Sequence, residues 1–499
     1  AKYFLHLQRE KFFMMTKLRK IILIPALTIV SFSGFFSCGV DRWPEYAHQT
    51  ALDTWILDIM QQNYLWYQEL PSYDDVNLFV EPASFLSKVK SKQDSYSFVD
   101  SVMATPLPTY GFDYSLVRNP DIDTAYNALI TYVIPGSPAA QAGLERGDWI
   151  MKVDTSYISK KYETYLLQGT KAVELTLGEW KEVEIEDGNE GGDGEDEGPT
   201  MEYRVVPIDE PVEMPAARIV EDNPVHKYEI IESPVKNIKV GYLMYNSFTA
   251  GTKAEPEKYN NELRSVSQKF KEAGVQAVIL DLRYNEGGSM DCVQLLGTIL
   301  TSADRLGEPM AYLEYNDKNT DKDATILFGT DREINLDLHS LIAITSGTTM
   351  GAPEMLIRSL FLEDVYPIAT VGSSTKGQNV ATEQFINEEF LWSVNPVVCT
   401  VYNSQHDTYG AISPATDLKV SETTIDGSTN YSEFLPFGTF DKDGKSERLL
   451  KIAIGVLDGT YPPKDDETPE ESATQTHFKV EKSVSSPASR RFSSKGLRL

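Results

Sequence analysis

Residues 344–360, with the sequence ITSGTTMGAPEMLIRSL, join an expected strand to an expected helix. The strand is the apolar run Leu341–Thr345, and the helix extends over Ala352–Leu362. A side chain at position 351 would lie at the helix N-terminus, where the helix dipole and free N–H groups stabilise developing negative charge. A nucleophile is favoured at such a place, but position 351 holds glycine.

The same alternation of strands and helices extends over 236–463. The patterns predict strands at 240–245 and 275–283 and helices at 257–273 and 290–302, besides the pair just described. Strands with intervening helices imply right-handed crossovers and a largely parallel sheet. Sites in such sheets are built at the carboxyl ends of the strands. We therefore predict an α/β core domain at 236–463.

Two further strand ends carry chemistry. The stretch DLRYNEGG, residues 281–288, ends a buried strand, and Gly287 and Gly288 allow a sharp turn that presents N–H groups, as an oxyanion hole requires. A tight turn without a ligand fits these two glycines as well. Lys376 follows another strand, and a lysine that is desolvated can lose its charge and act as a base.

The region before the core suggests two smaller domains. Leu52, Ile56, Met60 and Tyr64 are spaced four apart, as in one face of a helix, and a second helix is expected at 82–89. These two helices predict a helical domain at 39–105, after a pre-sequence and signal at 1–38.

The stretch VIPGSPAAQAGLERGDWIMKVD, residues 133–154, predicts a short helix opened by Pro138, a glycine cap and a strand at 149–153. This order resembles a PDZ domain, which we place at 106–210. Tyr110, Gly111 and Phe112 resemble the loop that receives the carboxyl end of a peptide. A PDZ domain binds by adding an extended peptide to a sheet edge. A PDZ-like domain kept only for packing or regulation is the equally supported alternative.

The remaining segments are polar. The acidic stretch 182–199 lacks the glutamate that a calcium loop needs at its twelfth position, so we interpret it as a solvated loop between PDZ strands, with weak calcium binding as the alternative. We expect a linker at 211–235 and a disordered tail at 464–499. The net charge of −28 argues against a nucleic-acid partner.

The N-terminal region carries export features. Basic residues around Lys17 precede an apolar run at 21–36, which ends at Ser37 and Cys38. This ending resembles a bacterial lipoprotein cleavage site, which implies a lipid on Cys38 and a membrane-anchored protein of the cell envelope, on the periplasmic or the outer-membrane face. Plain secretion and a single membrane anchor are the alternatives.

Cys292 and Cys399 are too few for a disulfide framework or a cysteine-rich zinc site, and we interpret them as buried small hydrophobes. The histidines are scattered, without an i, i+4 pair that would suggest a metal site. We expect neither a metal nor a cofactor.

Taken together, residues 45–460 resemble the C-terminal processing, or tail-specific, serine peptidases. These combine a PDZ domain with an α/β core of the ClpP/crotonase type and use a Ser-Lys dyad. Their Thr-Ala-Ser-Ala-Ser-Glu pattern matches residues 349–354, and Lys376 stands 25 residues after position 351, as the family lysine does after its serine. The resemblance implies that Lys376 is the general base, that N–H groups of Gly287, Gly288 and Ala352 form the oxyanion hole, and that Gly351 replaces the nucleophile.

Glycine cannot form an acyl-enzyme, and losing such a nucleophile lowers turnover by about six powers of ten. Ser346 and Thr349 offer hydroxyls, but both are displaced along the turn, where an error near 1 Å costs roughly 100-fold. Three interpretations follow. The chain is a silent homologue that binds unfolded polypeptides or protein C-termini, or an active peptidase that uses a displaced hydroxyl or has its glycine only in this chain, or a structural or adaptor lipoprotein.

Overall fold

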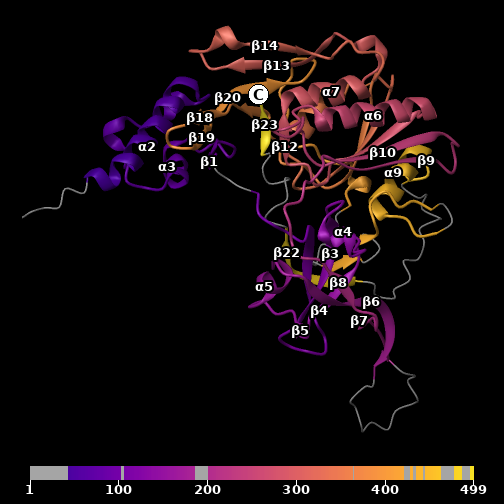
Figure 1. The fold of residues 1–499 in the computed structure, drawn as a ribbon. Helices are drawn as coiled ribbons and strands as arrows, with labels where there is room; N and C mark the ends of the chain where they lie inside the picture. The colour runs from indigo at the N-terminus through magenta and orange to yellow at the C-terminus, as the bar shows by residue number, and fades with distance from the viewer. Residues whose placement is uncertain are drawn as a thin grey trace, which may run out of the picture.

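The computed structural model describes residues 43–102, 106–185, 200–363, 365–420, 428–430, 434–441, 444–461, 477–485 and 495–499. Figure 1 shows an α/β body with the N-terminal helices on one side and a β-rich domain below it. The predicted multi-domain α/β architecture is confirmed. Within the described part of the chain, none of the helices is both long and apolar enough to cross a membrane.

The centre of the α/β body is a five-stranded sheet in the order β16-β15-β11-β10-β9. The first four strands are parallel to one another, and β9 is antiparallel at the edge. The sheet therefore agrees with the predicted crossovers. Its strands are β9 (Val225–Glu232), β10 (Lys239–Tyr245), β11 (Ala277–Asp281), β15 (Leu341–Thr345) and β16 (Ile368–Gly372).

Helices cover both faces of this sheet. Leu243 and Tyr245 face a core built with α6, α7 and α8, whereas Tyr242 and Met244, which alternate with them, face a second core with α9. Burial on both faces explains why the strands are continuous apolar runs. The helices are α6 (Lys258–Ala273), α7 (Met290–Leu300), α8 (Ala352–Leu360) and α9 (Arg448–Asp458).

A second sheet of six strands lies beside the first, in the order β12-β23-β17-β20-β13-β14. Its member β23 comes from the last residues of the chain and runs parallel to both neighbours. The strands are β12 (Gly287–Ser289), β13 (Pro309–Tyr315), β14 (Ala324–Leu327), β17 (Val380–Thr382), β20 (Val397–Tyr402) and β23 (Gly496–Arg498).

The N-terminal helices pack against this second sheet. The stripe predicted from Leu52, Ile56, Met60 and Tyr64 is fully buried, and it shares a core with Val397 of β20. The segment also adds β1 to a small sheet in the order β1-β19-β18, so it is part of the core's packing. These elements are α2 (Trp43–Asn63), α3 (Pro82–Val89), β1 (Phe98–Ser101), β18 (Phe385–Asn387) and β19 (Trp392–Asn395).

The β-rich domain contains the expected PDZ elements. Pro138 opens α4, Gly143 has a positive φ after it, and the predicted strand at 149–153 is present. Of the acidic stretch, residues 186–199 lie outside the described part; the strands on either side of it pair with each other. The elements are β2 (Phe112–Arg118), β3 (Tyr126–Val133), α4 (Pro138–Gln141), β4 (Trp149–Val153), β5 (Ser156–Tyr157), α5 (Glu163–Leu167), β6 (Val173–Ile185), β7 (Thr200–Pro207) and β8 (Val212–Met214).

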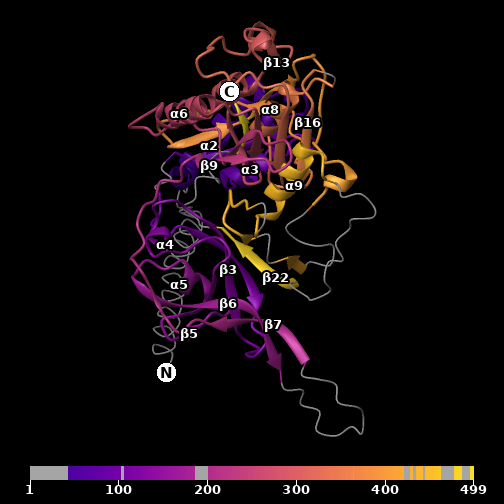
Figure 2. The ribbon, with the colours of Figure 1, turned by 90° about the vertical axis from the view of Figure 1, so that its right-hand side faces the viewer.

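Two expectations about polar segments need correction. The expected linker at 211–235 contains β8 and β9, so the core domain begins at β9 and not at 236. The expected disordered tail at 464–499 contains β22 (His477–Val484) and β23. Figure 2 shows β22 lying along the PDZ strands, and β21 (Ser428–Asn430) pairs with its other edge. The strand β9 forms a hairpin with β10, whereas the polar tail contributes Phe478 and Leu497 to cores built by distant elements.

Hydrogen bonds join the PDZ domain to the core. The hydroxyl of Tyr132 on β3 donates to Asp222 at 2.8 Å, and Asn246 after β10 donates to the same hydroxyl at 2.9 Å. Arg146 donates to the carbonyl of Thr131 at 2.9 Å, and its guanidinium lies 4.4 Å from the ring centre of Phe437. All of these groups are buried or nearly so, so the junction is a packed interface.

Candidate active site

The turn between β15 and α8 is fixed by its own hydroxyl groups. The Thr349 hydroxyl, which is fully buried, accepts from the N–H of Ser346 at 3.0 Å and donates to the carbonyl of Leu282 at 2.9 Å. The Ser346 hydroxyl donates to the carbonyl of Arg283. Both candidate hydroxyls therefore tie the turn to the end of β11. Neither is among the three atoms nearest to where a side chain at position 351 would begin.

Gly351 caps α8 with a φ of 71°, a conformation that favours glycine. A Cβ atom there would lie 2.5 Å from the carbonyl carbon of Gly496 and 2.7 Å from its Cα, and nearer still to the nitrogen of Leu497. Cβ atoms do not occur this close to backbone atoms. Position 351 therefore accepts only glycine while residues 496 and 497 occupy this place.

Glu354 holds the turn and the lysine loop together. Its fully buried carboxylate accepts from the N–H of Gly351 at 2.8 Å, which is the return bond of a capping box. It also accepts from the N–H groups of Gly377 at 2.5 Å and Gln378 at 2.9 Å and from the hydroxyl of Thr375. Sequence reasoning did not assign Glu354 a role, although a glutamate three residues after the helix cap is a capping signal.

Gly287 and Gly288 form the predicted turn, with φ of 123° and 137°. Asn285 supports it by accepting from the N–H of Gly287 at 3.0 Å, while its carbonyl accepts from the N–H of Met350 at 3.2 Å. The turn is thereby held beside position 351. If Gly287 carried a Cβ atom, the atom nearest to it would be the carbonyl oxygen of Gly496. The structure thus brings three predicted positions, 287, 288 and 351, around one peptide group.

Lys376 lies in the loop after β16. Its N–H donates to the carbonyl of Thr349 at 3.0 Å, which places the lysine loop against the turn before position 351. Its side chain, however, is exposed to solvent. A lysine that acts as a neutral base depends on desolvation. The role of Lys376 as general base therefore stays a prediction. Ala352, the remaining expected oxyanion donor, is the fully buried first residue of α8.

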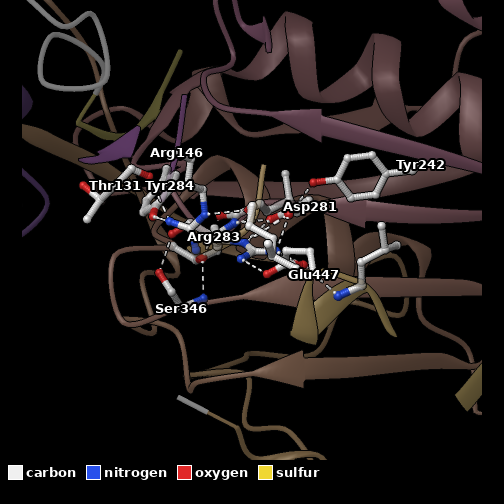
Figure 3. A network of polar contacts seen from close by, with 12 residues as sticks. Thr131, Arg146, Tyr242, Asp281, Arg283, Tyr284, Ser346 and Glu447 are labelled. Atoms are coloured by element: carbon white, nitrogen blue, oxygen red, sulfur yellow. Dashed lines mark hydrogen bonds and ion pairs between the residues drawn. The ribbon is translucent and has the colours of Figure 1, made fainter. Parts of the chain in front are cut away.

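A buried ion network lies next to the turn and supports it (Figure 3). Arg283, only 1% exposed, pairs with Asp281 and with Glu447, each at 2.8 Å, and Tyr242 donates to Asp281 at 2.8 Å. Burial alone would raise the pKa of Glu447, but the Arg283 guanidinium holds that pKa below its ordinary value. Because the carbonyl of Arg283 accepts from Ser346, the network positions the turn as well as the strand end.

The expected peptide-receiving loop lies at the start of β2. Tyr110, Gly111 and Phe112 are buried, and the carbonyl of Gly111 accepts from the N–H of Ile134 at 2.8 Å. The edge of β2 that a peptide would extend is paired with β22, antiparallel, from Tyr114 opposite Val484 to Val117 opposite Val480. This edge is thus occupied by another segment of the chain, and peptide binding at Tyr110, Gly111 and Phe112 stays a prediction.

The cysteines take no part in the site. Cys292 and Cys399 are free and buried, as predicted, and burial raises the pKa of each thiol to about 12. Buried thiols of this kind are inert. Cys38, the expected lipidation site, lies outside the described residues. In the parts of the chain that the structure describes, no cluster of His, Cys, Asp and Glu side chains could hold a metal ion.

Comparisons with known proteins agree with this arrangement. Residues 51–98 match the family model of the peptidase S41 N-terminal domain, residues 129–176 that of a PDZ domain, and residues 239–391 that of peptidase family S41. A crystal structure from Bacteroides fragilis NCTC 9343, described as an S41 protease, is 39% identical. The match covers 81% of this chain and 97% of that chain, with a TM-score of 0.69.

More distant structures include the photosystem II D1 C-terminal processing protease, at 14% identity, with 75% of this chain and 92% of that chain covered and a TM-score of 0.39. Another is mature CPAF, at 12% identity, with 82% and 97% covered and the same TM-score of 0.39. Likenesses at this level carry no argument about function. No curated protein matches the chain.

The role of Glu354 is tested by Glu354→Gln. The change keeps the shape but removes the charge and turns an amide NH₂ toward N–H donors, so we expect the free energy of unfolding to fall by about 3 kcal/mol. Urea unfolding measures this. The matched control is Glu229→Gln on β9, whose carboxylate is partly exposed; a loss for Glu354→Gln as small as that of the control would contradict the assignment.

The ion network is tested by Glu447→Gln across pH. The fold lowers the pKa of Glu447 below its unfolded value of about 4.3. The stability that the ionised carboxylate contributes is therefore complete above about pH 4.3 and is lost as pH falls through the pKa of the folded state. The variant should be less stable than the wild type at pH 7. The gap between the two free energies of unfolding should narrow as pH falls below about 4.3. A gap that stays constant from pH 7 to pH 3 would show that Glu447 is not held ionised.

Proposed function

Because the chain belongs to the S41 peptidase family, we propose that it is a catalytically impaired member that binds extended polypeptides. The observation that carries this proposal is Gly351. It occupies the nucleophile position at the N-terminus of α8, beside the Gly287–Gly288 turn, and has no side chain to attack a carbonyl carbon. The family's proteases act through such a nucleophile, whose loss typically costs about six powers of ten in turnover.

The neighbouring groups support the same conclusion. Ser346 and Thr349 direct their hydroxyls to backbone carbonyls at the end of β11, so freeing either would dismantle the turn. Lys376 is exposed and has no hydroxyl at position 351 to activate. What is retained is the support of the site: Glu354 still accepts from the turn and from the lysine loop, and Asn285 still holds the glycine turn.

The features that bind polypeptide are retained as well. The edge of β2 and the space between β12 and β17 each accommodate an extended strand in this structure. Strand addition uses main-chain hydrogen bonds, which any extended polypeptide can supply. Unfolded polypeptides and protein C-termini are therefore the class of ligand that we propose.

The test uses purified protein, a fluorescently labelled unfolded casein and a fluorophosphonate probe. We expect neither cleavage nor labelling, together with casein binding measured by fluorescence anisotropy. The reference for cleavage is the Lys376→Ala variant. Casein cleavage that this variant abolishes would instead identify an active peptidase with a displaced hydroxyl. Absence of both cleavage and binding would favour a structural or adaptor role.

We also propose that the protein is exported and lipid-anchored at Cys38 in a bacterial cell envelope. The basic residues around Lys17, the apolar run at 21–36 and the Ser37-Cys38 ending support this proposal. In cells grown with radiolabelled palmitate, the wild type should be labelled and found in the membrane fraction. Cys38→Ala should lose both properties, and Cys292→Ala should lose neither. Membrane association that survives Cys38→Ala would reject the lipid anchor.

A further inference from the structure

The strand β23 lies against Gly351 in the space between β12 and β17, which we call the cleft. It sits between β12 and β17, with Gly496 opposite Gly287 and Leu497 opposite both Gly288 and Ala381. The N–H of Gly496 donates to the carbonyl of Glu286 at 2.7 Å. Leu497 is fully buried in the main hydrophobic core. A segment remote in sequence therefore completes the sheet on which the site is built.

The peptide bond between Gly496 and Leu497 is the part of β23 that lies nearest to position 351. The carbonyl carbon of Gly496 is 2.5 Å from the Cβ position of residue 351, and its oxygen is the atom nearest to the Cβ position of Gly287. The N–H of Gly287, one of the expected oxyanion donors, is bonded to Asn285 in this arrangement. A serine side chain at position 351 would hold the strand farther away. Glycine therefore lets β23 approach the N-terminus of α8 more closely than a substrate could approach a serine enzyme.

Gly496 is itself fitted to the cleft. Its φ is 71°, and a Cβ atom on it would lie 2.7 Å from Nε2 of Gln378 and closer still to Oε1. These atoms are the far end of a flexible side chain, although Nε2 of Gln378 donates to the carbonyl of Val380 at 2.9 Å. The close approach thus requires glycine above all at 351, where the neighbours are backbone atoms of residues 496 and 497.

The strand β22 occupies the PDZ groove at the same time. The hydroxyl oxygen of Ser483 on β22 lies 2.9 Å from the hydroxyl oxygen of Ser115 on β2. Lys482 on β22 forms an ion pair with Glu163 of α5. Its later end, at Val484, pairs nearest to the Tyr110–Phe112 loop, which is the direction in which the carboxyl end of a peptide would approach. Phe478 anchors the other end, 5.0 Å from Trp149 between ring centres.

We propose that residues 477–485 and 495–499 are a built-in ligand of this protein, which fills its PDZ groove and its cleft in cis. This inference rests on the proposed function, because it identifies the polypeptide that those two surfaces hold. An external polypeptide must displace the two strands, so its apparent affinity is reduced by the fraction of molecules in which they are detached. Gly351 then has a second consequence besides the missing nucleophile. It stabilises the state in which β23 lies between β12 and β17.

The experiment compares the full-length wild type with Leu497→Asp. Leu497 is fully buried in the main core, so a carboxylate there would be cut off from water and β23 should detach while the core strands stay in place. The matched control is Leu327→Asp on β14 of the same sheet, where the side chain is 43% exposed. The probe is a fluorescent peptide with the sequence of residues 477–499. We expect Leu497→Asp to bind it at least 10-fold more tightly than the wild type and the control do.

Hydrogen exchange provides the second measurement, which does not depend on external binding. Amides in 285–290 and 380–384 should exchange at least 10-fold faster in Leu497→Asp than in the wild type, because they lose their partner strand. If the two proteins bind the peptide with equal affinity and exchange these amides at equal rates, the proposal of a built-in ligand is overturned, although the protein still binds peptide. If neither protein binds the peptide, the proposed function fails. Hydrogen exchange alone then decides whether β23 occupies the cleft: faster exchange in the variant supports occupation, and unchanged exchange rejects it.

The occupant could instead be donated by a second copy of the chain. Sedimentation of the wild type over a 100-fold range of concentration distinguishes the two arrangements. A monomer whose amides at 285–290 remain protected supports occupation in cis. A dimer that dissociates on dilution, with loss of that protection, would overturn it.

Discussion

The contact on which the site depends is the approach of two backbones at Gly351 and Gly496. No side chain separates them, so the strand at 496–498 joins the sheet between β12 and β17 and buries Leu497 in the main core. A single Cβ atom on either residue would lie closer than 3.0 Å to the other segment or to Gln378, a distance that real Cβ atoms essentially never show. In our proposal, the residue that lacks the nucleophile is thus also the residue that admits the strand. The proposed loss of catalysis and the presence of the strand would then share one physical cause.

The surroundings of position 351 are held by buried hydrogen bonds and ion pairs. Glu354 ties the turn to the lysine loop, and the Asp281–Arg283–Glu447 network fixes the end of β11 beneath it. Buried charges of this kind are costly unless every member is paired, and here each carboxylate accepts several hydrogen bonds. These groups are needed to hold the strand ends in register whether or not chemistry takes place. Their presence therefore fits a peptide-binding protein as well as an enzyme.

Much of the fold could be predicted from the sequence. The strand Leu341–Thr345, the helix start at Ala352 and the PDZ strand at 149–153 follow from local periodicity and glycine or proline signals. The family resemblance implied that positions 351 and 376 belong to one site, and the bond from the N–H of Lys376 to the carbonyl of Thr349 places their loops side by side. The strands β22 and β23 could not be predicted, because each segment is polar and its apolar residue, Phe478 or Leu497, finds partners only through distant contacts. The strand β9 was missed although it pairs with β10, the next strand along the chain. The exposure of Lys376 also depends on tertiary packing, which local sequence does not reveal.

The central claim is that the bare α-carbon at position 351 seats the strand at 496–498. It is tested most directly by Gly351→Ala, which adds one methyl group and no reactive atom, followed by hydrogen exchange of the amides at 496–498 and 287–289. The account predicts that the added Cβ expels the strand, so that both groups of amides lose protection while the amides of β10 and β11 keep theirs. Protection at 496–498 that equals the wild-type value would contradict it.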